Sequence, residues 1–121
     1  MLASERMLKI FTAIRSAIRK EENYVIIENP GSGKIVQFTL DSPSRELVMD
    51  IPIHGLTQNE FDGLINELSG FARDAATNEA ISFQESHPFE RINDAVTQAE
   101  KIFREVYRLP PDFDVTIRVF S

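Results

Sequence analysis

The sequence predicts an α+β fold: a single two-layer domain, in which a largely antiparallel sheet carries helices. Three short segments of alternating side chains follow one another within residues 24–53 and are separated by turn sequences. Amphipathic helical patterns precede and follow them, and a last alternating segment closes the chain. Consecutive strands with short turns favour antiparallel pairing. The predicted order is α-βββ-α-(β)-α-β within one domain, residues 1–121.

The first helix is predicted from Glu5 to about Lys20, because apolar residues recur there at three- and four-residue spacing. Ser4 is the predicted N-cap, since its hydroxyl can accept a hydrogen bond from an otherwise unpaired N–H. Basic residues outnumber acidic ones, so a transit peptide or membrane-surface helix is an alternative interpretation. An ordinary first helix of the domain, with cations on its solvated face, is the interpretation we favour.

The three central segments are predicted strands with one buried face and one mixed face. They span residues 24–27, 35–40 and 46–51, with turns at 29–33 and 41–44. Ile35 and Val48 project to the second face, and Phe120 of the last segment joins them. Either a helix covers this face within the monomer, or these three residues form a partner or dimer surface.

The second helix begins with a strong local signal. Thr57 and Glu60 match the capping box, and Leu56 and Phe61 stand at the positions of a hydrophobic staple. The apolar stripe continues to Ala75, across a Ser-Gly pair that can kink the helix or divide it.

The remaining elements are read from apolar spacing and prolines. Ala80–Gln84 is either a short strand or a loop. The third helix is predicted from near Pro88 to about Arg108. Two prolines follow it, and residues 113–119 alternate as a final strand.

Composition narrows the possible functions. The 121 residues include no cysteine, which excludes disulfides, thiol catalysis and cysteine metal sites and fits a cytoplasmic location. The formal charge of −6 disfavours nucleic-acid binding. No run approaches the roughly 20 apolar residues of a membrane span, so no membrane association is expected.

Gly31-Ser32-Gly33-Lys34 is the stretch that most resembles a phosphate-binding loop. A P-loop places its glycines five apart between a strand and a helix, whereas a strand follows here and Ile35 replaces the magnesium-binding hydroxyl. The sequence therefore predicts a hairpin turn in which Gly31 and Gly33 adopt positive φ.

The two histidines, His54 and His87, are the remaining candidates for chemistry. Catalytic zinc needs three protein ligands, and neither histidine has a second histidine nearby in sequence. No catalytic residue, metal ligand or cofactor is predicted. An alternative function, a small ligand-binding protein or enzyme, would need a sheet–helix pocket near His54 or His87.

Three segments resemble the bacterial type III secretion chaperone-like superfamily, including its YbjN-type branch. They are the N-terminal helix, the strands of residues 34–52 leading into Leu56–Glu60, and Asp94–Tyr107. The resemblance covers most of the chain and implies a dimeric, non-enzymatic binder of partner proteins. A strand after the last helix departs from the usual ending of secretion chaperones.

The expected function is therefore a protein-binding module, chaperone-like or regulatory, without enzymatic activity. We expect a homodimer that binds a protein partner, either through the apolar second face or through addition of an extended partner segment to a sheet edge.

Overall fold

The computed structural model describes residues 1–121 and confirms the α+β class, with three α-helices and one antiparallel sheet of six strands. The helices are α1 (Ala3–Arg19), α2 (Gln58–Glu67) and α3 (Ile92–Lys101). The strands are β1 (Tyr24–Glu28), β2 (Ile35–Asp41), β3 (Glu46–Pro52), β4 (Gly70–Arg73), β5 (Ala80–Pro88) and β6 (Thr116–Phe120). A 3-10 turn (Phe89–Arg91) precedes α3, and a π-helical turn (Ile102–Val106) follows it.

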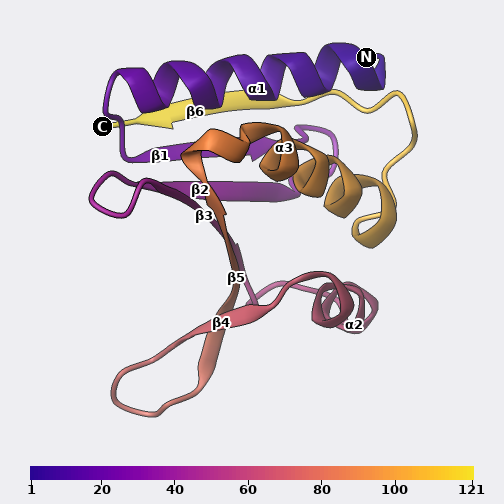
Figure 1. The fold of residues 1–121 in the computed structure, drawn as a ribbon. Coiled ribbons are helices and arrows are strands. Elements are labelled where there is room, and N and C mark those ends of the chain that lie inside the picture. The colour runs from indigo at the N-terminus through magenta and orange to yellow at the C-terminus, as the bar shows by residue number, and fades with distance from the viewer.

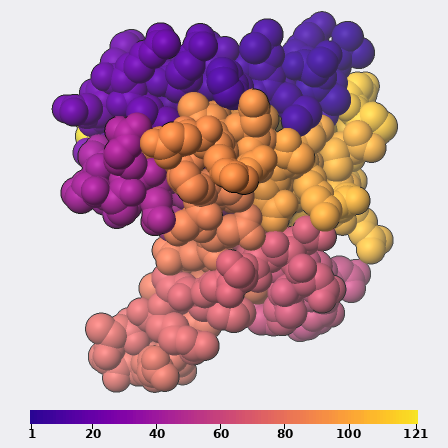
Figure 2. Space-filling view, viewed as in Figure 1, coloured from indigo at the N-terminus to yellow at the C-terminus, as the bar shows by residue number.

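The strands are arranged in the order β4-β5-β3-β2-β1-β6, and every neighbouring pair is antiparallel. The predicted three-strand meander thus forms the middle of the sheet, and the C-terminal strand forms one edge. Helix α1 lies along β1 and β6, with α3 packed beside it (Figure 1). The β4–β5 hairpin extends away from this body together with α2 (Figures 1 and 2).

One face of the sheet is buried under the helices, and the other is open. Alternate residues of β1, β2 and β3 are fully buried, while the residues between them keep partial exposure. The buried side chains of β2, such as Phe38, join Ile10 and Ile14 of α1 and Ala99 of α3 in one core. No helix covers the second face within the monomer, so that alternative from the sequence is excluded.

Helix α1 begins earlier than predicted. Its N-cap is Leu2, whose side chain caps nothing, and Ser4 lies inside the first turn. The two additional residues are helical because the N-terminal end is held: the Met1 amino group donates to the Asp112 carbonyl oxygen at 2.8 Å, and Arg6 N donates to the Leu2 carbonyl oxygen at 3.0 Å. The N-cap prediction is therefore wrong.

The segment after α2 is a strand, and the prediction of a helix reaching Ala75 is wrong. Helix α2 ends at Glu67, and β4 then pairs with β5. Phe71 lies opposite Phe83, and their ring centroids are 4.9 Å apart. Pairing with β5 outweighs the helical spacing of the apolar residues. Without β4, the nine-residue strand β5 would leave the backbone N–H and C=O groups that face away from β3 unpaired.

Strand β5 includes His87, so the third helix starts later than the sequence indicated. At its other end, this helix stops before the two prolines: Arg108 has a left-handed backbone, with φ of 56°. Phe113 and Val115 are buried but lie outside the ladder, and β6 begins at Thr116.

Candidate functional site

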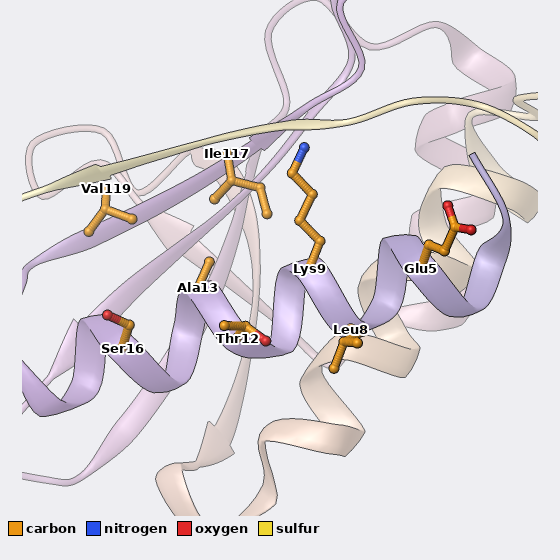
Figure 3. A pocket seen from close by; sticks show the side chains of 8 residues that line it. All are labelled: Glu5, Leu8, Lys9, Thr12, Ala13, Ser16, Ile117 and Val119. Atoms are coloured by element: carbon orange, nitrogen blue, oxygen red, sulfur yellow. The ribbon is translucent and has the colours of Figure 1, made fainter.

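An open groove of about 530 Å³ runs between α1 and β6, and it is the largest in the structure (Figure 3). We call it the α1–β6 groove. Leu8, Ala13, Ile117 and Val119 supply its apolar lining, with Glu5, Lys9, Thr12 and Ser16 beside them. A smaller cavity of about 190 Å³ shares Ala13, Ser16 and Val119 and extends the groove to Lys20 and Glu22.

The apolar walls of the groove are unusually accessible. Leu8 is 65% exposed and Val119 is 42% exposed, although Leu8 shares its helix with the fully buried Ile10 and Ile14. Ile117 and Val119 point from β6 towards α1 (Figure 3). An exposed apolar groove of this kind is typical of a surface that binds a partner.

Strand β6 also leaves its outer backbone groups unpaired. Leu40 N donates to the Asn23 carbonyl oxygen, and Asn29 N donates to the Lys34 carbonyl oxygen. The Asn23 carbonyl group and the Asn29 N–H group therefore point to β2, and in an antiparallel ladder this direction alternates from one residue to the next. The backbone groups of Ile26, and of the residues two positions before and after it, thus point to β6, where Arg118 lies opposite Ile26. Ile117 and Val119 therefore direct their N–H and C=O groups away from the sheet.

The two edges of the sheet differ in their protection. Strand β4 at the other edge has only four residues, and its pairing shifts register between Ala72 and Arg73. Short length and irregular register discourage pairing with another chain. Strand β6 has five residues in regular register, with Arg118 as its single charge. It is the edge better suited to accept an additional strand.

Arg6 fixes the position of α1 relative to the segment that enters β6. Its side chain is fully buried, and its guanidinium group donates to both carboxylate oxygens of Glu100 on α3, at 2.7 and 2.5 Å. It also donates to the Phe113 carbonyl oxygen at 2.8 Å and lies 3.6 Å from the centre of the Phe113 ring. The sequence placed this cation on a solvated face, and that prediction is wrong.

The predicted partner residues Ile35, Val48 and Phe120 all lie on the open face of the sheet. They do not form one contiguous patch. Phe120 lies opposite Tyr24, and these two aromatic side chains are 43% and 41% exposed. Val48 lies in the same cross-strand row, beyond Thr39, whereas Ile35 lies opposite Glu28 at the other end of the strands.

The Gly-Ser-Gly-Lys stretch is a hairpin turn, as predicted, but only Gly33 has positive φ, at 74°. Lys34 binds Glu60 of α2 through both carboxylate oxygens, at 3.0 and 2.9 Å. Glu60 also completes the predicted capping box with Thr57. Burial alone would raise the pKa of Glu60, but the hydrogen bonds from Lys34 and Thr57 and the charge of Lys34 lower it. The lysine thus stabilises the start of α2.

A cavity of about 270 Å³ lies beside this turn and includes His54, Lys34 and Tyr107 in its lining. Burial and the nearby charge of Glu60 raise the pKa of Tyr107 well above its usual value. Its hydroxyl therefore stays protonated and donates to the Ile35 carbonyl oxygen at 2.8 Å. This hydrogen bond joins the residue that follows the π-helical turn to the start of β2.

The two histidines do not converge. His87 lies opposite Leu47 near the start of β3, whereas His54 follows the end of that seven-residue strand. This places them roughly 20 Å apart. His87 Nε2 lies 2.9 Å from Glu85 Oε1 without an aligned hydrogen bond. No three His, Asp or Glu side chains gather in a way that could hold a metal ion.

The sequence analysis predicted that a partner could add a strand to a sheet edge, but it did not predict the α1–β6 groove. Two features of the sequence point to this groove: Leu8 falls outside the buried stripe of α1, and residues 113–119 alternate as a strand does. Neither signal reveals that β6 pairs with β1 and lies under α1.

Comparison with known proteins yields no match among family models, curated proteins or solved structures. The fold defines the class of the protein, an α+β domain with its helices on one face of an antiparallel sheet. None of its helices combines the length and apolar character needed to cross a bilayer.

Proposed function

We propose that this chain is a non-enzymatic protein-binding module, chaperone-like or regulatory, which binds an extended segment of a partner at the edge of β6. The observation that carries the proposal is the coincidence of unpaired backbone groups at Ile117 and Val119 with the apolar α1–β6 groove. Backbone hydrogen bonds to an added strand supply affinity, and pockets for alternate side chains supply specificity. The resemblance to the secretion chaperone-like superfamily supports the same role.

The proposed binding mode follows from the geometry of β6. A partner strand would hydrogen-bond to the outward N–H and C=O groups and continue the sheet beyond β6. Every second side chain of that strand would then enter the α1–β6 groove, next to Ile117 and Val119. The segment gains burial of Leu8 and Val119, the most exposed apolar side chains of the groove.

A proline at position 119 tests the binding mode. The N–H of Val119 points outward, so Val119→Pro removes a donor that no strand of the domain uses, while its ring blocks an incoming strand. Val119→Ala is the matched control. Recovery of a host protein from lysate, identified by mass spectrometry, should be lost with Val119→Pro and kept with Val119→Ala.

A second variant makes the outcome independent of proline effects on folding. Leu8→Glu lies on the opposite wall, where the side chain is already 65% exposed, so folding should be preserved. It should also abolish recovery of the same protein. Equal recovery by wild type, Val119→Pro and Leu8→Glu would contradict the proposed site.

The proposal includes a homodimer, formed through the open face of the sheet. Phe120, Tyr24 and Val48 lie there in one cross-strand row, on the face of the sheet opposite the α1–β6 groove. Size-exclusion chromatography with light scattering should give a dimer for wild type and a monomer for Val48→Glu. A monomeric wild type would remove this part of the proposal.

A cytoplasmic location, which the absence of cysteine suggests, also belongs to the proposal.

A further inference from the structure

The distribution of charge around the α1–β6 groove narrows the chemistry of the partner, on the basis of the proposed function. Residues 1–20 carry five cations and one anion, whereas the rest of the chain carries eight cations and eighteen anions. Helix α1 is therefore the cationic side of an acidic protein. Arg6 is neutralised by Glu100, which leaves the exposed cations of α1 to set the local potential.

These cations have no carboxylate partners within the chain. Every ion pair of the structure lies elsewhere, except for the one that Arg6 forms. Lys9 donates to the Val115 carbonyl oxygen at 2.9 Å, which places its ammonium group at one end of the groove. On α1 and β6, the cations without ion pairs are Lys9, Arg15 and Arg19, together with Lys20 at the C-cap of α1 and Arg118 of β6. Glu5 and Glu22 are the two anions that line the groove and its extension.

A second copy of the chain fits this edge poorly. Two β6 strands related by a two-fold axis must pair antiparallel, with their outward residues opposite one another. The two-fold axis then passes through position 117, 118 or 119 of both strands. With the axis at position 118, the two Arg118 side chains lie directly opposite each other. With the axis at position 117 or 119, they are diagonal neighbours on the same face. Like charges at such positions destabilise a strand pair.

We propose that the α1–β6 groove binds an acidic extended segment of another protein, in which apolar and acidic residues alternate. Side chains of an added strand alternate between the two faces of the sheet. Those beside Ile117 and Val119 face the apolar groove, and those between them lie beside Arg118 on the open face. Acidic residues at the second set lie beside the guanidinium group of Arg118, which has no ion pair, and electrostatic complementarity of this kind selects among partners.

Three synthetic peptides test the charge preference directly. Each is a fluorescein-labelled eight-residue peptide that alternates valine with a second residue, which is glutamate, threonine or lysine. Fluorescence anisotropy with the full chain should give tightest binding for the glutamate peptide. The lysine peptide should bind about tenfold more weakly, as two or three favourable cross-strand charge contacts become unfavourable. The preference should shrink as the salt concentration rises.

Charge reversal at Arg118 locates the effect. Arg118→Glu should abolish or invert the preference between the glutamate and lysine peptides. Arg104→Glu is the matched control, since Arg104 is exposed, has no ion pair and lies outside the groove. It should leave the preference unchanged. Val119→Pro should weaken binding of all peptides.

The outcomes separate this inference from the proposed function. Equal binding of the three peptides, lost in Val119→Pro, would overturn the acidic preference and leave strand addition intact. Absence of binding by any peptide, or binding insensitive to Val119→Pro, would overturn strand addition itself. A dimer in light scattering that Val119→Pro converts to monomer would show that a second copy occupies the edge, and it would overturn the inference.

Discussion

Replacement of Arg6 by methionine is the sharpest test of how this fold holds α1 in place. Arg6 is fully buried and joins three parts of the chain: α1, Glu100 of α3 and the carbonyl group of Phe113. Methionine has similar length and keeps the apolar contacts of the side chain, but it cannot donate a hydrogen bond. The substitution Arg6→Met therefore isolates the ionic and hydrogen-bonding contribution.

The expected loss of stability is large because the partner charge stays behind. The Glu100 side chain is only 13% exposed, so its carboxylate would lose most of its stabilising donors without gaining full hydration. Removal of one member of a buried ion pair costs about 3–5 kcal/mol. For 121 residues, this corresponds to a fall in melting temperature of roughly 12–20 °C.

Urea unfolding and calorimetry should be measured for Arg6→Met, Glu100→Met and the double variant. The double variant should recover at least half of the lost free energy of unfolding, because replacing both members leaves no unpaired buried charge. Arg15→Met is the control on the same helix, since Arg15 is exposed, and it should stay within about 0.5 kcal/mol of wild type. A loss below about 1 kcal/mol for Arg6→Met, or a double variant no more stable than the single, would refute the reasoning.

Three further predictions concern the turn at residues 29–34 and the start of α2. Thr57→Ala removes the capping hydroxyl and should lower the free energy of unfolding by about 1 kcal/mol, measured in urea. Gly33→Ala should cost about 1–2 kcal/mol, because φ is 74° there, whereas Gly31→Ala, with its nearest neighbouring atom at 3.7 Å, should be tolerated; equal effects would contradict this. The pKa of Glu60 is lowered on folding, so its carboxylate stabilises the fold above its unfolded pKa of about 4.5, and this contribution is lost as pH falls below that value. Urea unfolding between about pH 5 and 3 should show that the free energy of unfolding falls less steeply with decreasing pH for Glu60→Gln than for wild type. Equal slopes for the two proteins would exclude this contribution of Glu60.

Elements defined by neighbouring residues could be predicted from the sequence. The meander, the hairpin turns and the capping box of Thr57 and Glu60 depend on alternation, on turn residues and on contacts three residues apart, all of which are visible in the chain itself. The location of Ile35, Val48 and Phe120 on one face also follows from alternation alone.

Features that depend on distant pairing could not be predicted. Residues 70–73 have helical apolar spacing, yet they form a strand because β5 provides a partner. Arg6 has the spacing of a surface cation, yet it is buried because Glu100 and Phe113, more than ninety residues away, surround it with acceptors. Likewise, only the pairing of β6 with β1 creates the free edge beside α1.

The sequence by itself therefore determined the fold class, the meander and the capped helix, because these rest on interactions between residues close in the chain. The tertiary structure alone decided which strand forms the unprotected edge and which helix lies beside it. It also decided which cations remain unpaired, because each of these depends on the contacts between segments far apart in sequence.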